Sequence, residues 1–461
     1  MKNSKFLSIS MALMLGVGSI TGCSNSKTTN QDGVTAISIW STDSHSKTIF
    51  ERLTNDYNNN QGIADGIKIE YKVIDGDTYS KNLDLALQSG QGPDIFQAGA
   101  EKSKIDNNYI ASIGDIPGGE DFANECLKKY PNSAISYNGK VYCLPTGVTT
   151  RGLIYNKDMF KEAGIVDENG EPKPPETFEE MRETAKLLTN KSKNQFGIIL
   201  PEKWSGWIDS DIVSPLLECV GHVGFDPVEG EFDYSGVAPI LEAYMGMIDD
   251  GSVYPGADGI DNDTARAFFS EGLIGMKIGY SFDVGVLNDQ FPAKCDWGVA
   301  PLPVTDKNNR YRQPMTMATT FAVNQASVES KGGDKLLKVM QWLISEDMAK
   351  ELYKEGATLP YDEKIVEEVK LENPKTGWQE FADMIQISSI ANDKPSRDMT
   401  GYLSLDERIR TQVLSGQASP ADVLEQFNKD CKAASEKYYS LHTDESFEKY
   451  LDKDWNIKLN N

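Results

Sequence analysis

The sequence predicts an α/β fold, in a chain long enough for two or three domains or for one large bilobed body. Apolar and polar residues alternate over 37–39 and again over 67–73, and residues 93–96 form a short apolar run, so three strands are expected. Apolar residues at helical spacing lie between them, over 49–57 and 83–87. Strand, helix, strand, helix, strand is the order typical of a sheet with crossover helices.

Helix signals continue through the rest of the chain. Thr177 and Glu180 form a capping box, in which the Thr177 hydroxyl accepts from the Glu180 N–H while Glu180 reaches back. One long helix is expected over 334–353. Another is expected over 419–434, with Ser419 as its N-cap and proline in its first turn.

The first residues predict a location outside the cytoplasm. Residues 1–5 are cationic, and residues 6–20 are apolar but too few to span a bilayer as a stable helix. The run Ile20-Thr21-Gly22-Cys23 follows and resembles the lipobox of bacterial lipoproteins. We therefore expect residues 1–22 to be a signal peptide, Cys23 to carry lipid, and residues 23–33 to be a flexible tether to the cell membrane.

Charge and composition narrow the classes of partner. The chain has 46 Lys and Arg against 70 Asp and Glu, a net charge of −24, and it has no basic patch. Nucleic acid is therefore not an expected partner, and the charge is typical of a protein that stays soluble at a cell surface. No segment after Cys23 is apolar for long enough to cross a membrane.

The cysteines and histidines do not predict a metal site. Only three histidines occur, far apart, and we expect no cofactor. The cysteines after Cys23 are widely spaced, without a C-x-x-C pair, so buried free thiols are favoured although two bridges would be possible. These cysteines are Cys126, Cys143, Cys219, Cys295 and Cys431.

Five blocks, in order and spacing, carry a family resemblance along nearly the whole chain after Cys23. They are residues 89–96 (SGQGPDIF), 137–145 (YNGKVYCLP), 155–178 (YNKD, AGI and PETF), 269–279 (F-x-x-G-x-x-x-M-x-x-G) and 297–303 (WGVAPLP). The sequence resembles the extracellular solute-binding proteins of bacterial ABC importers, the large group that includes maltose-binding protein. The resemblance implies a two-lobed periplasmic-binding-protein-like fold of type II, each lobe an open α/β sheet, with three hinge crossings and a ligand cleft between the lobes.

The resemblance also divides the chain. Residues 34–147 plus 304–358 are expected to form the N-terminal lobe, and residues 148–303 plus 359–461 the C-terminal lobe. The crossings are expected near 145–148, 300–304 and 356–361, each a proline-containing stretch between strand-like and helix-like segments.

The function implied is capture of a carbohydrate, with an oligosaccharide as the expected ligand, and its delivery to an ABC permease by a monomeric, lipid-anchored protein without catalysis. Three alternatives stay open. A secreted glycan-acting enzyme would use carboxylate pairs such as Asp209 and Asp211, or Asp249 and Asp250. The same fold could take a peptide or a polyamine. A metal-dependent adhesin would use the acidic run 258–263, which lacks the spacing of a calcium-binding loop and is more typical of a turn capping a helix at Thr264.

Sugars favour aromatic faces flanked by carboxylates, amides and arginine. Candidate ligand contacts follow from where such residues fall in the family pattern, with Tyr280 the firmest. Asp43 could instead cap the next helix, Arg151 could bridge the lobes, and Trp378 could simply pack. The candidates are Trp40, Asp43, His45, Gln97, Glu101, Thr149, Arg151, Trp204, Trp207, Tyr280, Phe282, Asp283 and Trp378.

Overall fold

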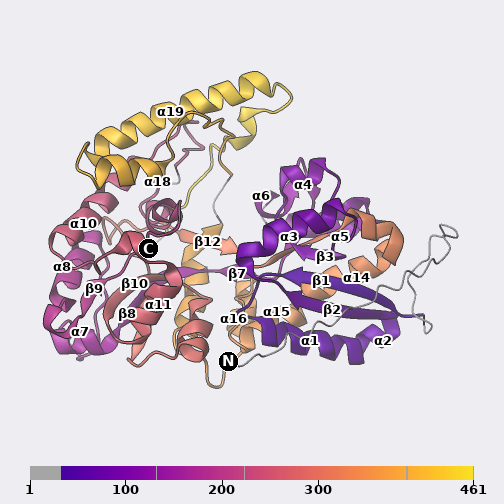
Figure 1. The fold of residues 1–461 in the computed structure, drawn as a ribbon, viewed down its shortest axis with the longest axis horizontal. Helices are drawn as coiled ribbons and strands as arrows, with labels where there is room; N and C mark the ends of the chain where they lie inside the picture. Colours follow the sequence, from indigo (N-terminus) through magenta and orange to yellow (C-terminus); the bar gives the residue numbers. More distant parts are fainter. Residues whose placement is uncertain (1–32, 131, 223, 391–392, 460–461) are drawn as a thin grey trace, which may run out of the picture.

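The computed structural model describes residues 33–130, 132–222, 224–390 and 393–459. The expected signal peptide, Cys23 and all of the tether except Gly33 lie outside these residues. Two α/β bodies lie side by side, joined at the middle of the molecule (Figure 1). Each body contains its own open sheet.

The N-terminal body is built on a five-stranded sheet of order β2-β1-β3-β13-β6. The first three strands run parallel, whereas β13 is antiparallel to both β3 and β6. The strands are β1 (Thr35–Ser41), β2 (Ile67–Val73), β3 (Ile95–Gln97), β6 (Cys143–Pro145) and β13 (Thr320–Val323), with a small hairpin of β4 (Ser136–Tyr137) and β5 (Lys140–Val141) beside them.

Helices cover both faces of this sheet (Figure 1). Ile37, Ile39 and Ile95 of the strands pack with Phe50 and Leu336 of the helices in one buried core. The helices are α1 (Lys47–Asn59), α2 (Gln61–Asp65), α3 (Gly76–Gln88), α4 (Lys102–Asp106), α5 (Glu120–Lys129), α6 (Asn132–Ile135), α14 (Gly333–Leu343) and α15 (Glu346–Lys354).

The single helix expected over 334–353 is in fact two. The prediction was wrong because the chain leaves the helix at Ile344, and Ser345 then caps a new one by accepting a hydrogen bond from the Met348 N–H. Glu346 and Asp347 in the first turn of α15 favour this start, since carboxylates stabilise the positive end of a helix dipole.

The C-terminal body contains a four-stranded sheet of order β11-β8-β10-β9. Its strands are β8 (Arg151–Asn156), β9 (Phe196–Ile198), β10 (Ile274–Tyr280) and β11 (Trp297–Ala300). Its main helices are α7 (Lys157–Ala163), α8 (Phe178–Leu188), α9 (Ser214–Cys219), α10 (Val237–Asp249), α11 (Asn262–Ser270), α12 (Asp283–Gly285), α16 (Glu363–Glu368), α17 (Trp378–Asp383), α18 (Leu405–Arg408) and α19 (Pro420–Leu441).

Side-chain caps begin two helices of the C-terminal body, α8 and α11. The Thr177 hydroxyl accepts from the Glu180 N–H as expected, but the Glu180 carboxylate reaches back to the N–H of Glu176 rather than to that of Thr177. Asp261 caps α11 by accepting from the Thr264 N–H, so the acidic run there is confirmed as a capping turn.

A small sheet of order β14-β12-β7 joins the two bodies: β7 (Val148–Thr149), β12 (Gln313–Met317) and β14 (Ser388–Ile390). The second crossing therefore lies at β12, later than the expected 300–304. Val304 packs in the core of the C-terminal body, and Arg312 pairs through its N–H with the carbonyl of Ile457 near the chain's end. The predicted start of the second N-terminal-lobe segment at residue 304 was too early.

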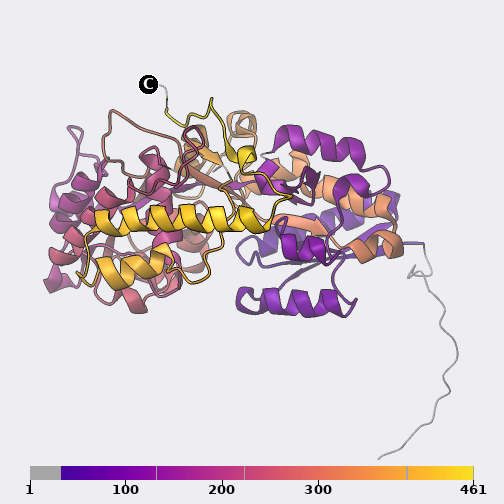
Figure 2. The same ribbon diagram turned by 90° about the horizontal axis from the view of Figure 1, so that it is seen from above.

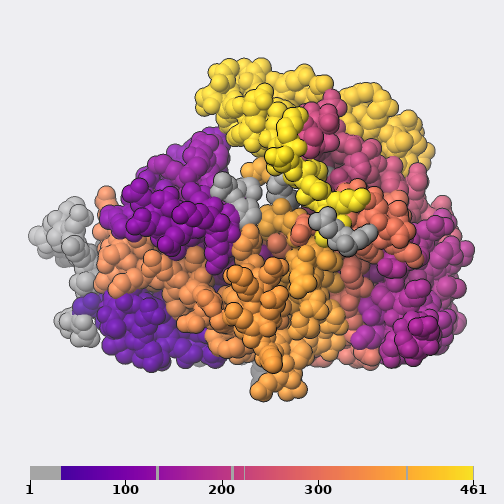
Figure 3. All heavy atoms as spheres, turned by 180° about the vertical axis from the view of Figure 1, so that it is seen from behind, coloured from indigo at the N-terminus to yellow at the C-terminus, as the bar shows by residue number. Residues whose placement is uncertain are grey.

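The longest helix, α19, extends from the C-terminal body toward the N-terminal one (Figure 2). From behind, the surface is hollowed between the violet part of the N-terminal body and the yellow α19 (Figure 3). All five described cysteines are free, and four of them are buried, as the sequence favoured. Within the described ranges no helix is both long and apolar enough to span a bilayer.

Candidate interlobe binding site

The two bodies present strand ends to each other. In the N-terminal body, β1 ends at Ser41 and the parallel β3 at Gln97, so the loops that follow lie at one edge of that sheet. In the C-terminal body, β10 ends at Tyr280, which pairs in register with Arg151 at the start of β8. These strand ends and the segments next to them supply most of the predicted ligand contacts.

A ladder of rings crosses from one body to the other. Tyr280 and Phe282 are stacked with centroids 4.8 Å apart and planes within 7°, and His45 stacks on Phe282 at 5.7 Å and 6°. The Arg151 guanidinium carbon lies 5.2 Å from the Tyr280 centroid. Gln290 adds a polar contact, with its Nε2 3.2 Å from His45 Nδ1. Four residues predicted from the sequence thus meet here, one of them from the N-terminal body.

The surroundings of His45 favour its neutral form. Partial desolvation and the nearby positive charge of Arg266 lower the pKa of His45, although Asp43 and other carboxylates act in the opposite direction. A neutral imidazole stacks without the desolvation penalty that a charged ring would carry. Each ring pair of this kind contributes about 0.5–1.5 kcal/mol beyond its buried area.

Asp43 and Gln97 hold the loop that carries His45. Asp43 accepts from the Ser46 N–H at 3.0 Å and from the Thr319 hydroxyl at 3.3 Å. Gln97 Oε1 accepts from the Thr42 N–H at 2.7 Å. The Asp43 carboxylate therefore braces the loop just before α1, whose N-cap residue is Ser46, rather than capping the helix itself.

Asp283 does not face a ligand: its side chain is 1% exposed, so the predicted contact is wrong for this conformation. It accepts from Arg266 Nε at 2.7 Å, lies 3.5 Å from Lys277 Nζ, and accepts from the Tyr280 N–H at 3.1 Å. The side chains of Arg266 and Lys277 are buried as well. This charge cluster therefore holds the end of β10 in place from the interior of the body.

Trp378 also belongs to the interior. It is 1% exposed, and its indole N–H donates to the carbonyl of Tyr353 at 2.9 Å. The predicted ligand contact is replaced by the alternative reading, in which this tryptophan packs in the core of the C-terminal body.

The other candidates lie around the ladder or apart from it. Trp204 is 41% exposed and meets Trp207 edge to face, with centroids 4.7 Å apart. Trp40 is half-buried beside Lys72, and Glu101 is exposed and pairs with Lys104. Thr149 lies in the joining strand β7 opposite Thr316.

The two buried cations next to the ladder, Arg266 and Lys277, were not predicted from the sequence. The signal was present in Lys277, the single charge in an otherwise apolar strand that is buried except at its last residue. A buried ammonium requires a carboxylate partner, and the nearest aspartate along the chain is Asp283. Arg266 carries no comparable signal, since its helix α11 is amphipathic and mostly polar at its start.

Glu202 is a buried carboxyl on the loop after β9. Burial raises the pKa of Glu202 from 4.5 to about 7, against the opposing effect of Arg410; Asp258 and Asp406 act in the same direction as burial. The unfolded chain releases this proton near pH 4.5 and the folded chain near 7, so the contribution of Glu202 to stability falls as the pH rises between these values.

We therefore expect Glu202→Gln to stabilise the protein relative to the wild type at pH 8, by up to about 3 kcal/mol, and to have little effect at pH 4. Urea unfolding at both pH values measures this difference. The exposed Glu229→Gln is the matched control. A Glu202→Gln effect that is the same at pH 4 and pH 8 would contradict the raised pKa.

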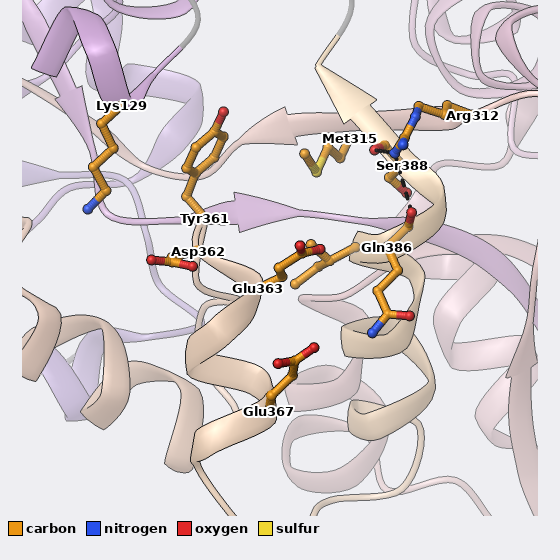
Figure 4. Close-up of a pocket in the computed structure, with 10 residues that line it drawn as sticks. Lys129, Arg312, Met315, Tyr361, Asp362, Glu363, Glu367, Gln386 and Ser388 are labelled. Atoms are coloured by element: carbon orange, nitrogen blue, oxygen red, sulfur yellow. Dashed lines mark hydrogen bonds between the residues drawn. The ribbon is translucent and has the colours of Figure 1, made fainter. Parts of the chain in front are cut away.

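A cavity of about 770 Å³ lies beside the joining strands (Figure 4). Lys129 of α5 lines it from the N-terminal body, opposite Glu363 and Glu367 of α16. Arg312 donates to the carbonyls of Gln386 and Ser388 at 3.3 and 3.1 Å. None of the predicted ligand contacts lines this cavity. In the parts of the chain that the structure covers, no group of three or more His, Cys, Asp or Glu could hold a metal ion.

Comparison with known proteins identifies the class. The model of the bacterial extracellular solute-binding protein family matches residues 47–350, more than half of the chain. The chain belongs to this family, a family of binding proteins that act outside the cytoplasm. The resemblance seen in the sequence is confirmed.

Solved structures share the fold. The GacH receptor of Streptomyces glaucescens, solved unliganded and with acarbose, has a TM-score of 0.66 and 18% identity, covering 90% of this chain and 100% of that one. The cyclic α-maltosyl-1,6-maltose binding protein of Arthrobacter globiformis has a TM-score of 0.64 and 18% identity, covering 88% and 100%. The two bodies are thus the lobes of a type II periplasmic binding protein, as predicted.

A sequence relative is the maltotriose-binding protein of Pyrococcus abyssi, 23% identical over 299 residues, which cover 63% of this chain and 59% of that protein. A mannitol-binding protein of Pseudomonas aeruginosa is 24% identical over 251 residues, 52% of this chain and 55% of that protein.

Proposed function

We propose that this protein binds a carbohydrate, an oligosaccharide by preference, between its two lobes and delivers it unaltered to an ABC permease. The observation that carries the proposal is the ring ladder of Tyr280, Phe282 and His45, with Arg151 at one end and one ring from the opposite lobe. Sugars bind to such edges because their C–H faces stack on rings while their hydroxyls bond to charged and amide groups.

The relatives support this ligand class. Proteins similar to this chain are named for binding maltotriose, cyclic α-maltosyl-1,6-maltose and mannitol, and the GacH receptor was solved in complex with acarbose. In the described conformation the rings contact each other, so a sugar stacked on Phe282 would replace part of the His45 contact. The ligand then shifts the protein toward the conformation for which it has the higher affinity. No bond of the ligand needs to change.

The location and the permease partner complete the proposal. Residues 1–22 act as a signal peptide, and lipid on Cys23 holds a monomer at the outer face of the cell membrane, or on the periplasmic side where a second membrane exists. Lipobox-like residues 20–23 support the anchor, and the family supports the importer partnership. Mass-spectrometric detection of a diacylglyceryl group on Cys23 tests the anchor.

Tyr280→Ala is expected to weaken sugar binding at least about tenfold, because it removes the contribution of one stacked ring to the binding free energy. Calorimetric titration with the member of a glycan panel that most raises the melting temperature measures this change. Tyr450→Ala, which removes a half-buried ring packed on the core of the C-terminal lobe, is the control. Equal affinity of Tyr280→Ala and the wild type would remove Tyr280 from the site.

A further inference from the structure

Trp204 and Trp207 lie on an irregular loop, residues 202–208, between β9 and the helical segment that leads to α9. Their rings meet edge to face at 65°, and much of Trp204 is exposed. A large exposed ring on a loop loses side-chain and backbone freedom when it stacks on a ligand, unless the loop is already held in place.

One arginine contacts the loop at two carbonyls. Arg410 Nη2 donates to the carbonyl of Glu202 at 2.7 Å and to that of Trp204 at 3.4 Å. Its Nη1 also lies 3.8 Å from the Glu202 carboxylate. Hydrogen bonds from a guanidinium are charge-assisted and stronger than neutral ones. Arg410 thus holds the first half of the loop.

Asp406 extends the same contact to the far end of the loop. Arg410 Nε donates to Asp406 Oδ2 at 2.8 Å, while Asp406 Oδ1 accepts from the Ile208 N–H at 3.0 Å. The Asp406 side chain is nearly buried, so this ion pair is shielded from solvent. A single Arg–Asp pair therefore connects the start, the middle and the end of the tryptophan loop.

The pair itself rests on a rigid base some two hundred residues further along the chain. It belongs to α18 and the π-helical turn that follows, Ile409–Val413. Ser404 and Glu407 cap α18 reciprocally, and Leu405, Ile409 and Val413 are buried in the core of the C-terminal lobe. The loop is thereby held by a base that cannot move without unpacking the core.

We propose that Arg410 and Asp406 are positioning residues that hold Trp204 and Trp207 in place as a preformed stacking platform for a glycosyl ring. The proposal rests on the carbohydrate function proposed above. Neither residue contacts the ligand. Their effect on affinity is exerted through the two tryptophans, since a loop that is already ordered loses less entropy on binding.

Arg410→Lys tests the proposal, because it keeps the charge but loses the planar fork that reaches both carbonyls and Asp406. Hydrogen–deuterium exchange of residues 203–208 should become at least about tenfold faster in this variant, with the melting temperature little changed. Affinity for whichever of maltotriose, raffinose and xylotriose binds the wild type should fall about tenfold. Arg182→Lys is the matched control, since Arg182 forms a similar forked pair with Asp250 on the same lobe.

A double-mutant cycle separates positioning from a general structural effect. In a Trp204→Ala background, Arg410→Lys should cause little further loss of affinity, because the platform is already gone. Full additivity of the two changes, or unchanged exchange of the loop in Arg410→Lys, would overturn the proposal. Asp406→Asn, which keeps its shape, gives a second variant if Arg410→Lys fails to fold. Failure of the wild type to bind any sugar of the glycan panel would overturn the carbohydrate function, and the platform with it. Wild-type binding that the variants retain would overturn the positioning role alone.

Discussion

Exchanging Asp283 for Asn should lower the free energy of unfolding by about 3–5 kcal/mol, the effect of removing one partner from a buried charge cluster. The carboxylate lies between Arg266 and Lys277, and all three side chains are at most 7% exposed. The amide keeps the shape but removes the negative charge that both cations face. Urea unfolding at neutral pH measures the change.

The same arginine provides the control. Arg266 also pairs with Asp263, whose side chain is 69% exposed, so Asp263→Asn should change stability by about 1 kcal/mol or less. Because Asp283 also accepts from the Tyr280 N–H, its loss should disturb the ring ladder and weaken sugar binding. Similar stability effects of the two substitutions would contradict the buried cluster.

Trp378→Ala should have the second large effect on stability. We expect it to lower the free energy of unfolding by about 3–5 kcal/mol, because it leaves a cavity in the core. Trp378→Phe separates packing from hydrogen bonding, because it keeps most of the ring but loses the N–H that donates to Tyr353. A smaller loss of about 0.5–1.5 kcal/mol follows from the lost hydrogen bond, because the Tyr353 carbonyl still accepts from the Gly356 N–H at 3.1 Å.

Sugar affinity distinguishes the core position of Trp378 from the ligand contact expected from sequence. At a temperature where the Phe variant is fully folded, its affinity should equal that of the wild type. A large loss of affinity with little loss of stability would instead place Trp378 in the cleft.

Much of the fold could be predicted because it depends on local patterns. Alternation over 67–73 and the short apolar run at 93–96 correspond to strands β2 and β3, and the capping signals at Thr177 and Asp261 begin helices. The boundary of the second crossing could not be predicted this way. It depends on Val304 packing in the C-terminal lobe and on pairing between Arg312 and the distant Ile457, neither of which leaves a local pattern.

The site was only partly predictable for a related reason. Tyr280, Phe282, His45 and Arg151 could be predicted to lie at the facing edges. They are at or just beyond strand ends, and such ends gather at one edge of a sheet. It could not show that Asp283, a few positions beyond Tyr280 on α12, turns inward toward two buried cations. It also could not link Arg410 to the tryptophan loop, because their contact spans about two hundred residues.

Equilibrium dialysis against a panel of di- to hexasaccharides, with chromatography of the recovered sugar, tests the central claim most directly. The account predicts that at least one oligosaccharide is retained at one molecule per protein and returns chemically intact after long incubation. Retention of none, or recovery of shortened products, would contradict a two-lobed protein that holds a sugar without altering it.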